Sequence, residues 1–151
     1  MAPLQTDPLW DRIPDHIGKK LVWTLWFATW IGLLAGLINQ VFYDYVVWFS
    51  AAHACLFWTM FRFRAAAFPV QVRLAYFVWV AAGAYIPYMT ILLYITMVGL
   101  ATNLFLGYCP LARIMYLMPW NRQEPFSSAL VLRVFFTPPV QGPFRPVDNW
   151  K

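Results

Sequence analysis

The chain has 151 residues, of which 62% are hydrophobic and only 11% are charged. Soluble domains carry about 45–50% apolar and about 25% charged residues, and a domain this small cannot bury so much apolar surface. The composition therefore argues against an ordinary soluble protein. The net charge of +5 does not indicate a nucleic-acid partner, because the basic residues flank long apolar runs, where they contact anionic lipid headgroups and set topology.

The first helix is predicted to cross a membrane. Residues 1–20, with prolines at positions 3, 8 and 14, are expected to form a cytoplasmic arm, since they lack the apolar core of a signal peptide. An uncharged run then extends from Leu21 to Tyr43. About 20 residues cross the hydrocarbon core of a bilayer, so we predict a transmembrane helix over about residues 21–40. The next uncharged run predicts a second helix over about residues 45–61.

The second half of the apolar region is predicted to be a helical hairpin. Arg62, Arg64 and Arg73 fill the connection that precedes it, and Pro69 disfavours helix at the residue before it, which favours a loop. The uncharged run from 74 to 112 is too long for one perpendicular helix. Pro87 tends to end or kink a helix, so we expect two short helices over about residues 73–86 and 89–107.

The distribution of basic residues predicts the orientation. Cytoplasmic loops collect Lys and Arg, and with four helices all eleven of them fall in the arm, the Arg62–Arg73 connection and the tail. We therefore predict an all-α, polytopic membrane protein of the bacterial cytoplasmic (inner) membrane. Its four transmembrane helices form two hairpins within residues 21–118, and both termini are cytoplasmic.

The cytoplasmic tail, residues 119–151, is predicted to contain one short helix. The stretch "EPFSSALVLRVFF" is mostly apolar, with Arg133 as the only charge after its first residue, and Pro125 fits a first helical turn. We expect this helix to lie at the membrane interface. The proline-rich end after it is expected to be extended.

Small residues recur at steps of four in the first helix, at Ala28, Gly32 and Gly36. This spacing lets two helix backbones approach closely. Packing within the protein is the favoured interpretation, and packing against another subunit is the alternative.

His53 lies in the middle of the second predicted helix, where a titratable side chain suggests a functional site. The alanines at 51, 52 and 54 leave a flat surface beside it, which an axial ligand of haem or a pigment would need. The plainer interpretation is a neutral imidazole that hydrogen-bonds to a neighbouring helix, and a contact with a partner protein is the third. The sequence identifies no cofactor and contains no metal-ligand spacing.

Gly107, Cys109, Pro110 and Arg113 follow the last predicted helix. We interpret them as a helix-end motif at the membrane interface, in which Gly107 and Pro110 end the helix, Arg113 contacts lipid phosphates, and Cys109 is structural. The alternative is a reactive thiol, because a nearby positive charge favours the thiolate.

Residues 72–115 also carry Arg73, then Gly83, then the run Gly107-Tyr108-Cys109-Pro110-Leu111. In this order they resemble the YgaP-like transmembrane family. The resemblance covers about a third of the chain and implies a helical hairpin. Some members carry a cytoplasmic rhodanese domain that handles sulfur, and this sequence contains none, so the resemblance does not imply sulfur transfer.

No enzymatic activity is expected. Asp44 is the only acid between Asp15 and Glu124, so no carboxylate pair is available within the membrane for acid–base chemistry. The favoured function is a non-catalytic accessory or assembly subunit of a larger bacterial membrane complex, with membrane lipids and other integral membrane subunits as partners. The alternative is a pigment- or haem-binding protein that uses His53, and the third hypothesis is transport of a small molecule or sulfur species.

Overall fold

The computed structural model describes residues 12–122 and 124–138, which form six α-helices and contain no strand. The helices are α1 (Asp15–Ile38), α2 (Val41–Met60), α3 (Phe68–Tyr85), α4 (Ile91–Leu106), α5 (Pro110–Tyr116) and α6 (Ser128–Phe136). The predicted all-α class is confirmed for this part of the chain. Most of the predicted arm and of the proline-rich end, residues 1–11 and 139–151, lie outside the described residues.

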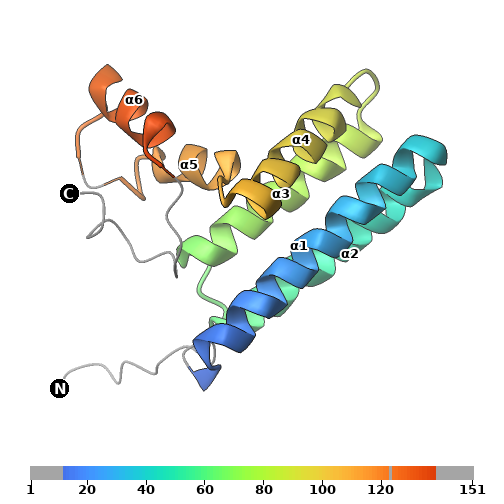
Figure 1. Cartoon of the computed structure of the whole chain (residues 1–151), viewed down its shortest axis with the longest axis horizontal. Coiled ribbons are helices and arrows are strands. Elements are labelled where there is room, and N and C mark those ends of the chain that lie inside the picture. The colour runs from blue at the N-terminus through green and yellow to red at the C-terminus, as the bar shows by residue number, and fades with distance from the viewer. Residues whose placement is uncertain (1–11, 123, 139–151) are drawn as a thin grey trace.

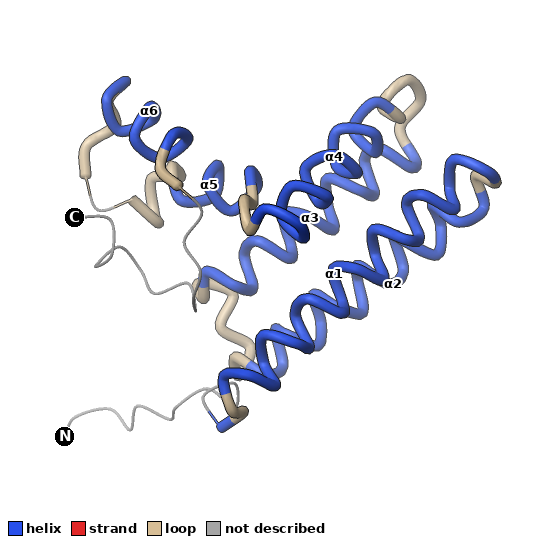
Figure 2. The backbone as a smooth tube through the Cα atoms, in the orientation of Figure 1, coloured by secondary structure: helices blue, strands red, loops and turns tan. Residues whose placement is uncertain are grey.

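The four long helices form two antiparallel hairpins. Figure 1 shows α1 and α2 side by side, and α3 and α4 as a second pair beside them. Contacts join α1 to α2 and α4, and α3 to α2 and α4, so each of the four long helices packs against two of the other three. The short helices α5 and α6 lie beyond the end of α4, and α5 packs against α3 (Figure 2).

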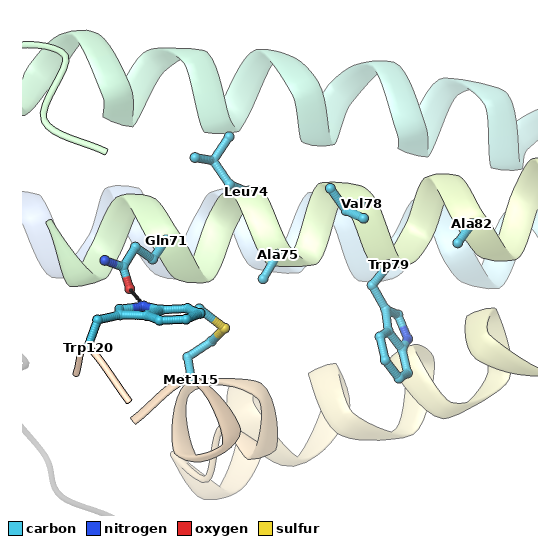
Figure 3. Close-up of a pocket in the computed structure, with 8 residues that line it drawn as sticks. All are labelled: Gln71, Leu74, Ala75, Val78, Trp79, Ala82, Met115 and Trp120. Carbon is cyan, nitrogen blue, oxygen red and sulfur yellow. Dashed lines mark hydrogen bonds between the residues drawn. The ribbon is translucent and has the colours of Figure 1, made fainter. Parts of the chain in front are cut away.

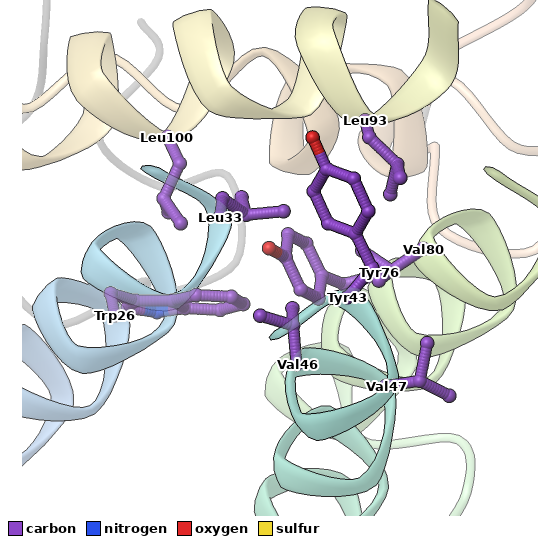
Figure 4. Close-up of a cluster of buried hydrophobic side chains, with 9 residues drawn as sticks. All are labelled: Trp26, Leu33, Tyr43, Val46, Val47, Tyr76, Val80, Leu93 and Leu100. Carbon is purple, nitrogen blue, oxygen red and sulfur yellow. The ribbon is translucent and has the colours of Figure 1, made fainter. Parts of the chain in front are cut away.

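The core lies where the four long helices converge (Figure 4). Leu33 and Val80 are completely inaccessible to solvent, and both indole and phenol rings contribute to the same cluster. Its members are Trp26, Leu33, Tyr43, Val46, Val47, Tyr76, Val80, Leu93 and Leu100. All four helices contribute, so the two hairpins share one core.

The length and apolar composition of the helices support one or two membrane spans. Among the described residues, α1 is the one helix that is long and apolar enough to cross a bilayer by itself. Helices α4 and α5 would pass the same test as a pair, but the chain bends by 97° between them. One or two spans are therefore supported, and the four-span topology stays a prediction.

Two helices begin earlier than the sequence predicted. Helix α1 starts at Asp15 rather than near residue 21, so Lys19 and Lys20 belong to its first turns. Helix α3 starts at Phe68, with Pro69 in its first turn. The prediction of a loop through Pro69 was wrong at this point, because proline at the start of a helix lacks only an N–H that would have no intrahelical partner. Arg73 is consequently helical and not part of the connection.

The tail helix begins later than predicted. Pro125 lies before α6, and Ser127 is its N-cap, with Oγ accepting a hydrogen bond from the backbone N–H of Leu130 at 3.1 Å. Serine is a favoured N-cap because its hydroxyl satisfies one of the free amides of the first turn. Arg133, in the last turn, forms a 2.7 Å ion pair with Glu124.

Candidate functional site

Arg73 is the most unusual residue inside the bundle. The early start of α3 places it in the second turn of that helix, and only 7% of its surface is exposed. No Asp or Glu of the described residues forms an ion pair with it. Burial of a cation without a carboxylate costs free energy unless other groups replace the hydrogen bonds that water would make. The groups that contact Arg73 therefore define the site.

Three kinds of contact surround the guanidinium of Arg73. Its Nε donates a hydrogen bond to Nε2 of His53 at 3.2 Å, and its Nη1 donates to the backbone carbonyl of Pro69 at 2.6 Å. Its carbon Cζ lies 3.4 Å from the ring centre of Phe57 and 5.8 Å from that of Trp26. Cation–π contacts of this kind are strongest where the cation is shielded from water. The aromatic rings and two acceptors therefore take the place of a counter-ion.

His53 is the hydrogen-bond partner that α2 presents to this cation. It is 4% exposed, and its ring makes edge contacts with Trp26 at 4.9 Å and with Phe57 at 5.3 Å between ring centres. Because Nε2 accepts the hydrogen bond from Arg73, this nitrogen carries no hydrogen, and the imidazole is neutral. The predicted hydrogen bond to a neighbouring helix is thus present, and its partner is Arg73.

The same contacts bear on the cofactor hypothesis for His53. An axial ligand must present a free imidazole nitrogen to the metal, and Nε2 is engaged by Arg73. Ligation through that atom requires Arg73 to move away. Within the described residues, no group of three or more His, Cys, Asp or Glu side chains could hold a metal ion.

Two buried hydroxyls near this cluster have no hydrogen-bond partner among the described residues. Ser50 lies one turn before His53 on α2, and Tyr76 lies one turn after Arg73 on α3. The Tyr76 ring packs edge-on against Trp26 at 4.8 Å. Buried polar groups are nearly always satisfied in native proteins, so these hydroxyls are positions where a water molecule or a small polar group would bind.

The Gly107–Pro110 segment ends α4 and starts α5. Gly107 has φ 68°, a left-handed conformation that suits glycine, and its N–H and that of Tyr108 bond back to the carbonyls of Asn103 and Thr102. Pro110 occupies the first turn of α5. The chain therefore turns sharply at the point where the sequence predicted the helix to end.

Cys109 caps the new helix. Its Sγ accepts a hydrogen bond from the backbone N–H of Ala112 at 3.4 Å. Burial raises the pKa of the Cys109 thiol, and this effect is opposed by the amides of Ala112 and Leu111 and by the charges of Arg73 and Arg113. The group is consequently a neutral thiol at physiological pH, which is the less reactive form.

Arg113 differs from the sequence-based expectation. It is 5% exposed, and its guanidinium donates to the backbone carbonyls of Val134 and Pro138 instead of facing lipid phosphates. Its Cζ lies 4.1 Å from the ring centre of Tyr108, whose hydroxyl donates to the Phe135 carbonyl at 2.9 Å. The free carbonyls at the end of α6 attract positive charge, so Arg113 and Tyr108 fasten α6 to α5.

The small-residue stripe on α1 packs within the protein at two of its three positions. A Cβ built on Gly32 would come within 2.7 Å of Val46 Cγ2, and one on Gly36 would collide with the ring of Tyr43. Both neighbours belong to α2. Ala28 is exposed on the outer surface of α1, so it does not share this contact.

Sequence reasoning missed Arg73, Tyr76 and Trp26 as members of one cluster. The signal for Arg73 was available in Pro69, since proline followed by an apolar run is typical of a helix start. The pairing of Arg73 with His53 was not available, because it depends on how α2 and α3 pack together.

Comparisons with protein-family models, with curated proteins and with solved structures found no match. The resemblance of residues 72–115 to the YgaP-like transmembrane family therefore stays a prediction based on its motif.

Proposed function

We propose that this protein is a non-catalytic accessory or assembly subunit of a larger complex in the bacterial cytoplasmic membrane. In this proposal α1 to α4 all cross the bilayer as two hairpins, and both termini are cytoplasmic. The observation that carries it is an exposed aromatic surface on α2, formed by Phe42, Tyr45, Trp48 and Phe49.

The four-span arrangement is supported by charge. Arg12, Lys19 and Lys20 lie before or at the start of α1, Arg62 and Arg64 lie between α2 and α3, and Arg113, Arg122 and Arg133 follow α4. These three places gather at the same end of the two hairpins (Figure 1). The turns at the other end contain no Lys or Arg, which is the asymmetry expected of a cytoplasmic and an opposite face.

The helices of the second hairpin are shorter than the hydrocarbon core of a typical bilayer is thick. Helices α2, α3 and α4 have 20, 18 and 16 residues, and 16 residues extend only about 24 Å. The hydrocarbon core is about 30 Å thick. Local thinning of the bilayer around the second hairpin accommodates this difference at modest cost.

The outer face of α2 exposes Phe42, Tyr45, Trp48 and Phe49, which we call the α2 aromatic face. Tyr45 is 63% and Trp48 is 72% exposed. The exposed positions Ala52 and Cys55 continue the same face with small side chains. Large rings beside small residues form an uneven surface that suits another helix.

The depth of Trp48 favours a protein partner over lipid. It lies seven residues into α2, or about 10 Å from the helix start at 1.5 Å per residue. Tryptophan in contact with lipid is enriched at headgroup level, and not at this depth. Aromatic residues are also enriched in protein interfaces, where they often dominate the binding energy.

The proposal is tested by photocrosslinking in native membranes. A photoreactive amino acid in place of Ala52 samples the α2 aromatic face, and the same group in place of Val98, exposed on α4, is the matched control. We expect one discrete protein adduct from position 52 that is weak or absent from position 98. Adducts with lipid alone from both positions would contradict the proposal.

The topology is tested separately. A phosphatase that is active only in the periplasm, inserted between Tyr85 and Ile91 in the turn that joins α3 and α4, should be active. The same phosphatase inserted between Met60 and Phe68 should be inactive. The reverse pattern would contradict the orientation.

A further inference from the structure

A groove extends along the outer side of α3, where α5 and the segment after it pass beside that helix (Figure 3). Its volume is about 460 Å³, within the range of about 300–1,000 Å³ typical of small-molecule sites. Ala75 and Ala82 leave space along α3, and Trp79, Met115 and Trp120 border it. The lining is apolar along most of its length.

One end of the groove is polar. The side-chain oxygen of Gln71 accepts hydrogen bonds from Trp120 Nε1 at 3.2 Å and from Asn121 Nδ2 at 2.7 Å. Its amide nitrogen donates to the backbone carbonyl of Ala66 at 3.0 Å. Gln71 thus joins the start of α3 to two other segments, the α2–α3 connection and the residues after α5.

Each of those two segments carries an arginine within two residues, in sequence, of a group that bonds Gln71. Arg64 lies two residues before Ala66 and is exposed, and Arg122 follows Asn121 and is partly exposed. The Arg122 guanidinium lies over the ring of Phe126 at 5.5 Å. Glu124, the nearest acid in the sequence, is paired with Arg133, so it does not neutralise this end of the groove.

The length of the groove matches one leaflet of a bilayer. From Gln71 to Ala82 is eleven residues along α3, which is about 16 Å at 1.5 Å per residue. The hydrocarbon core is about 30 Å thick, so one leaflet is about half of that. In the proposed orientation the polar end lies at the cytoplasmic surface, and the apolar part reaches toward the midplane.

We propose that this groove binds one acyl chain of an anionic phospholipid from the cytoplasmic leaflet, with the lipid phosphate held by Arg64 and Arg122. This rests on the four-span orientation proposed above. The planar guanidinium matches the geometry of a phosphate and binds it through paired hydrogen bonds. The apolar groove fixes the chain, while the arginines select the headgroup.

Native mass spectrometry of the purified chain in a mild detergent tests the proposal. The probes are phosphatidylglycerol and phosphatidylcholine with the same acyl chains, each titrated into delipidated protein. We expect the wild type to bind one phosphatidylglycerol about thirtyfold more tightly than one phosphatidylcholine, since two basic contacts contribute about 1 kcal/mol each. Equal affinity for the two lipids would overturn the headgroup assignment.

Three variants locate the binding. Ala75→Trp fills the groove and should weaken binding of both lipids by roughly tenfold, which corresponds to the loss of a well-fitted apolar contact. Ala28→Trp adds the same ring on the exposed side of α1 and should leave binding unchanged. Arg64→Gln combined with Arg122→Gln should weaken phosphatidylglycerol binding to about the level of phosphatidylcholine, and should affect phosphatidylcholine less, because its quaternary ammonium already offsets the charge of its phosphate.

The outcomes are separate from those of the subunit proposal, because these titrations use the isolated chain. If Ala75→Trp binds lipid as well as Ala28→Trp does, the groove is not the site and the inference is overturned. The expected lipid pattern in the isolated chain leaves the subunit proposal to the crosslinking at positions 52 and 98, which tests it independently.

Discussion

The contact between Arg73 and His53 gives the sharpest prediction about stability. Arg73→Met removes the buried guanidinium and keeps most of the side-chain volume. It leaves Nε2 of His53, in a ring that is 4% exposed, without its donor. A buried acceptor without a partner costs about 1–3 kcal/mol, and the lost cation–π contact with Phe57 adds up to about 2 kcal/mol. Relief of the cation's desolvation offsets part of this loss, so we expect a net destabilisation of about 2 kcal/mol.

The reciprocal variant His53→Leu leaves the cation buried without its imidazole acceptor. Removal of one partner from a buried charged pair costs about 3–5 kcal/mol. The carbonyl of Pro69 remains as an acceptor at 2.6 Å, so we expect the lower end, about 3 kcal/mol. The double variant replaces both partners with apolar groups and should be no less stable than His53→Leu, which gives a coupling energy of about 2 kcal/mol.

The assay is equilibrium unfolding of the purified protein by SDS in mixed micelles, followed by far-UV circular dichroism. Arg64→Gln is the matched control, because Arg64 is an exposed arginine in the α2–α3 connection, and its free energy of unfolding should change by less than about 0.5 kcal/mol. The reasoning is refuted if the losses in the double variant are simply additive, or if Arg73→Met is as silent as Arg64→Gln.

Three further predictions concern the helix ends and the close helix contact. Gly36→Leu should destabilise the protein by about 1–3 kcal/mol because the side chain collides with Tyr43, whereas Ala28→Leu, on an exposed surface, should stay within about 0.5 kcal/mol in the same unfolding assay. Arg113→Met should free the end of α6, at a cost of about 2–3 kcal/mol for hydrogen bonds from a charged donor, and should accelerate amide exchange in 128–136 but not in α1. With Cys55 replaced by serine, Cys109 should react with a maleimide at pH 8 at least about tenfold more slowly than in SDS-unfolded protein, because burial raises its pKa.

The Cys109 prediction also fixes a direction with pH. Since the pKa of the thiol is higher in the folded state, the unfolded chain loses the proton first as the pH rises through the ordinary value of about 8.5. Stability from this group is therefore complete below that value and falls above it. Rapid alkylation of the folded protein at pH 8 would show a reactive thiolate.

Faster exchange confined to α1 in Arg113→Met, or equal effects of Gly36→Leu and Ala28→Leu, would contradict the corresponding contacts.

The sequence predicted the elements of this fold better than their ends. Long uncharged runs, the break at Pro87 and the Gly107–Pro110 signal are local features, and helices occur in the predicted order between them. The start of α3 was wrong because Pro69 has opposite effects before a helix and in its first turn. That single boundary moved Arg73 from a connection into the buried part of a helix.

The site depended on packing that no local pattern contains. Arg73 and His53 are twenty residues apart on different helices, and Arg113 reaches the end of α6 more than twenty residues away. Charge alone indicated that both arginines face lipid headgroups. In the structure, Arg73 is instead buried against the rings of Phe57 and Trp26. Arg113 is buried against backbone carbonyls at the end of α6.

The central claim is that the protein works as part of a larger membrane complex. Extraction of an affinity-tagged chain from native membranes in a mild detergent, followed by native mass spectrometry, measures this directly. The account predicts a species heavier than the 17.6 kDa chain that contains another integral membrane protein in a fixed ratio and dissociates in Trp48→Ala. A partner-free monomer that carries only lipid, in wild type and variant alike, would contradict it.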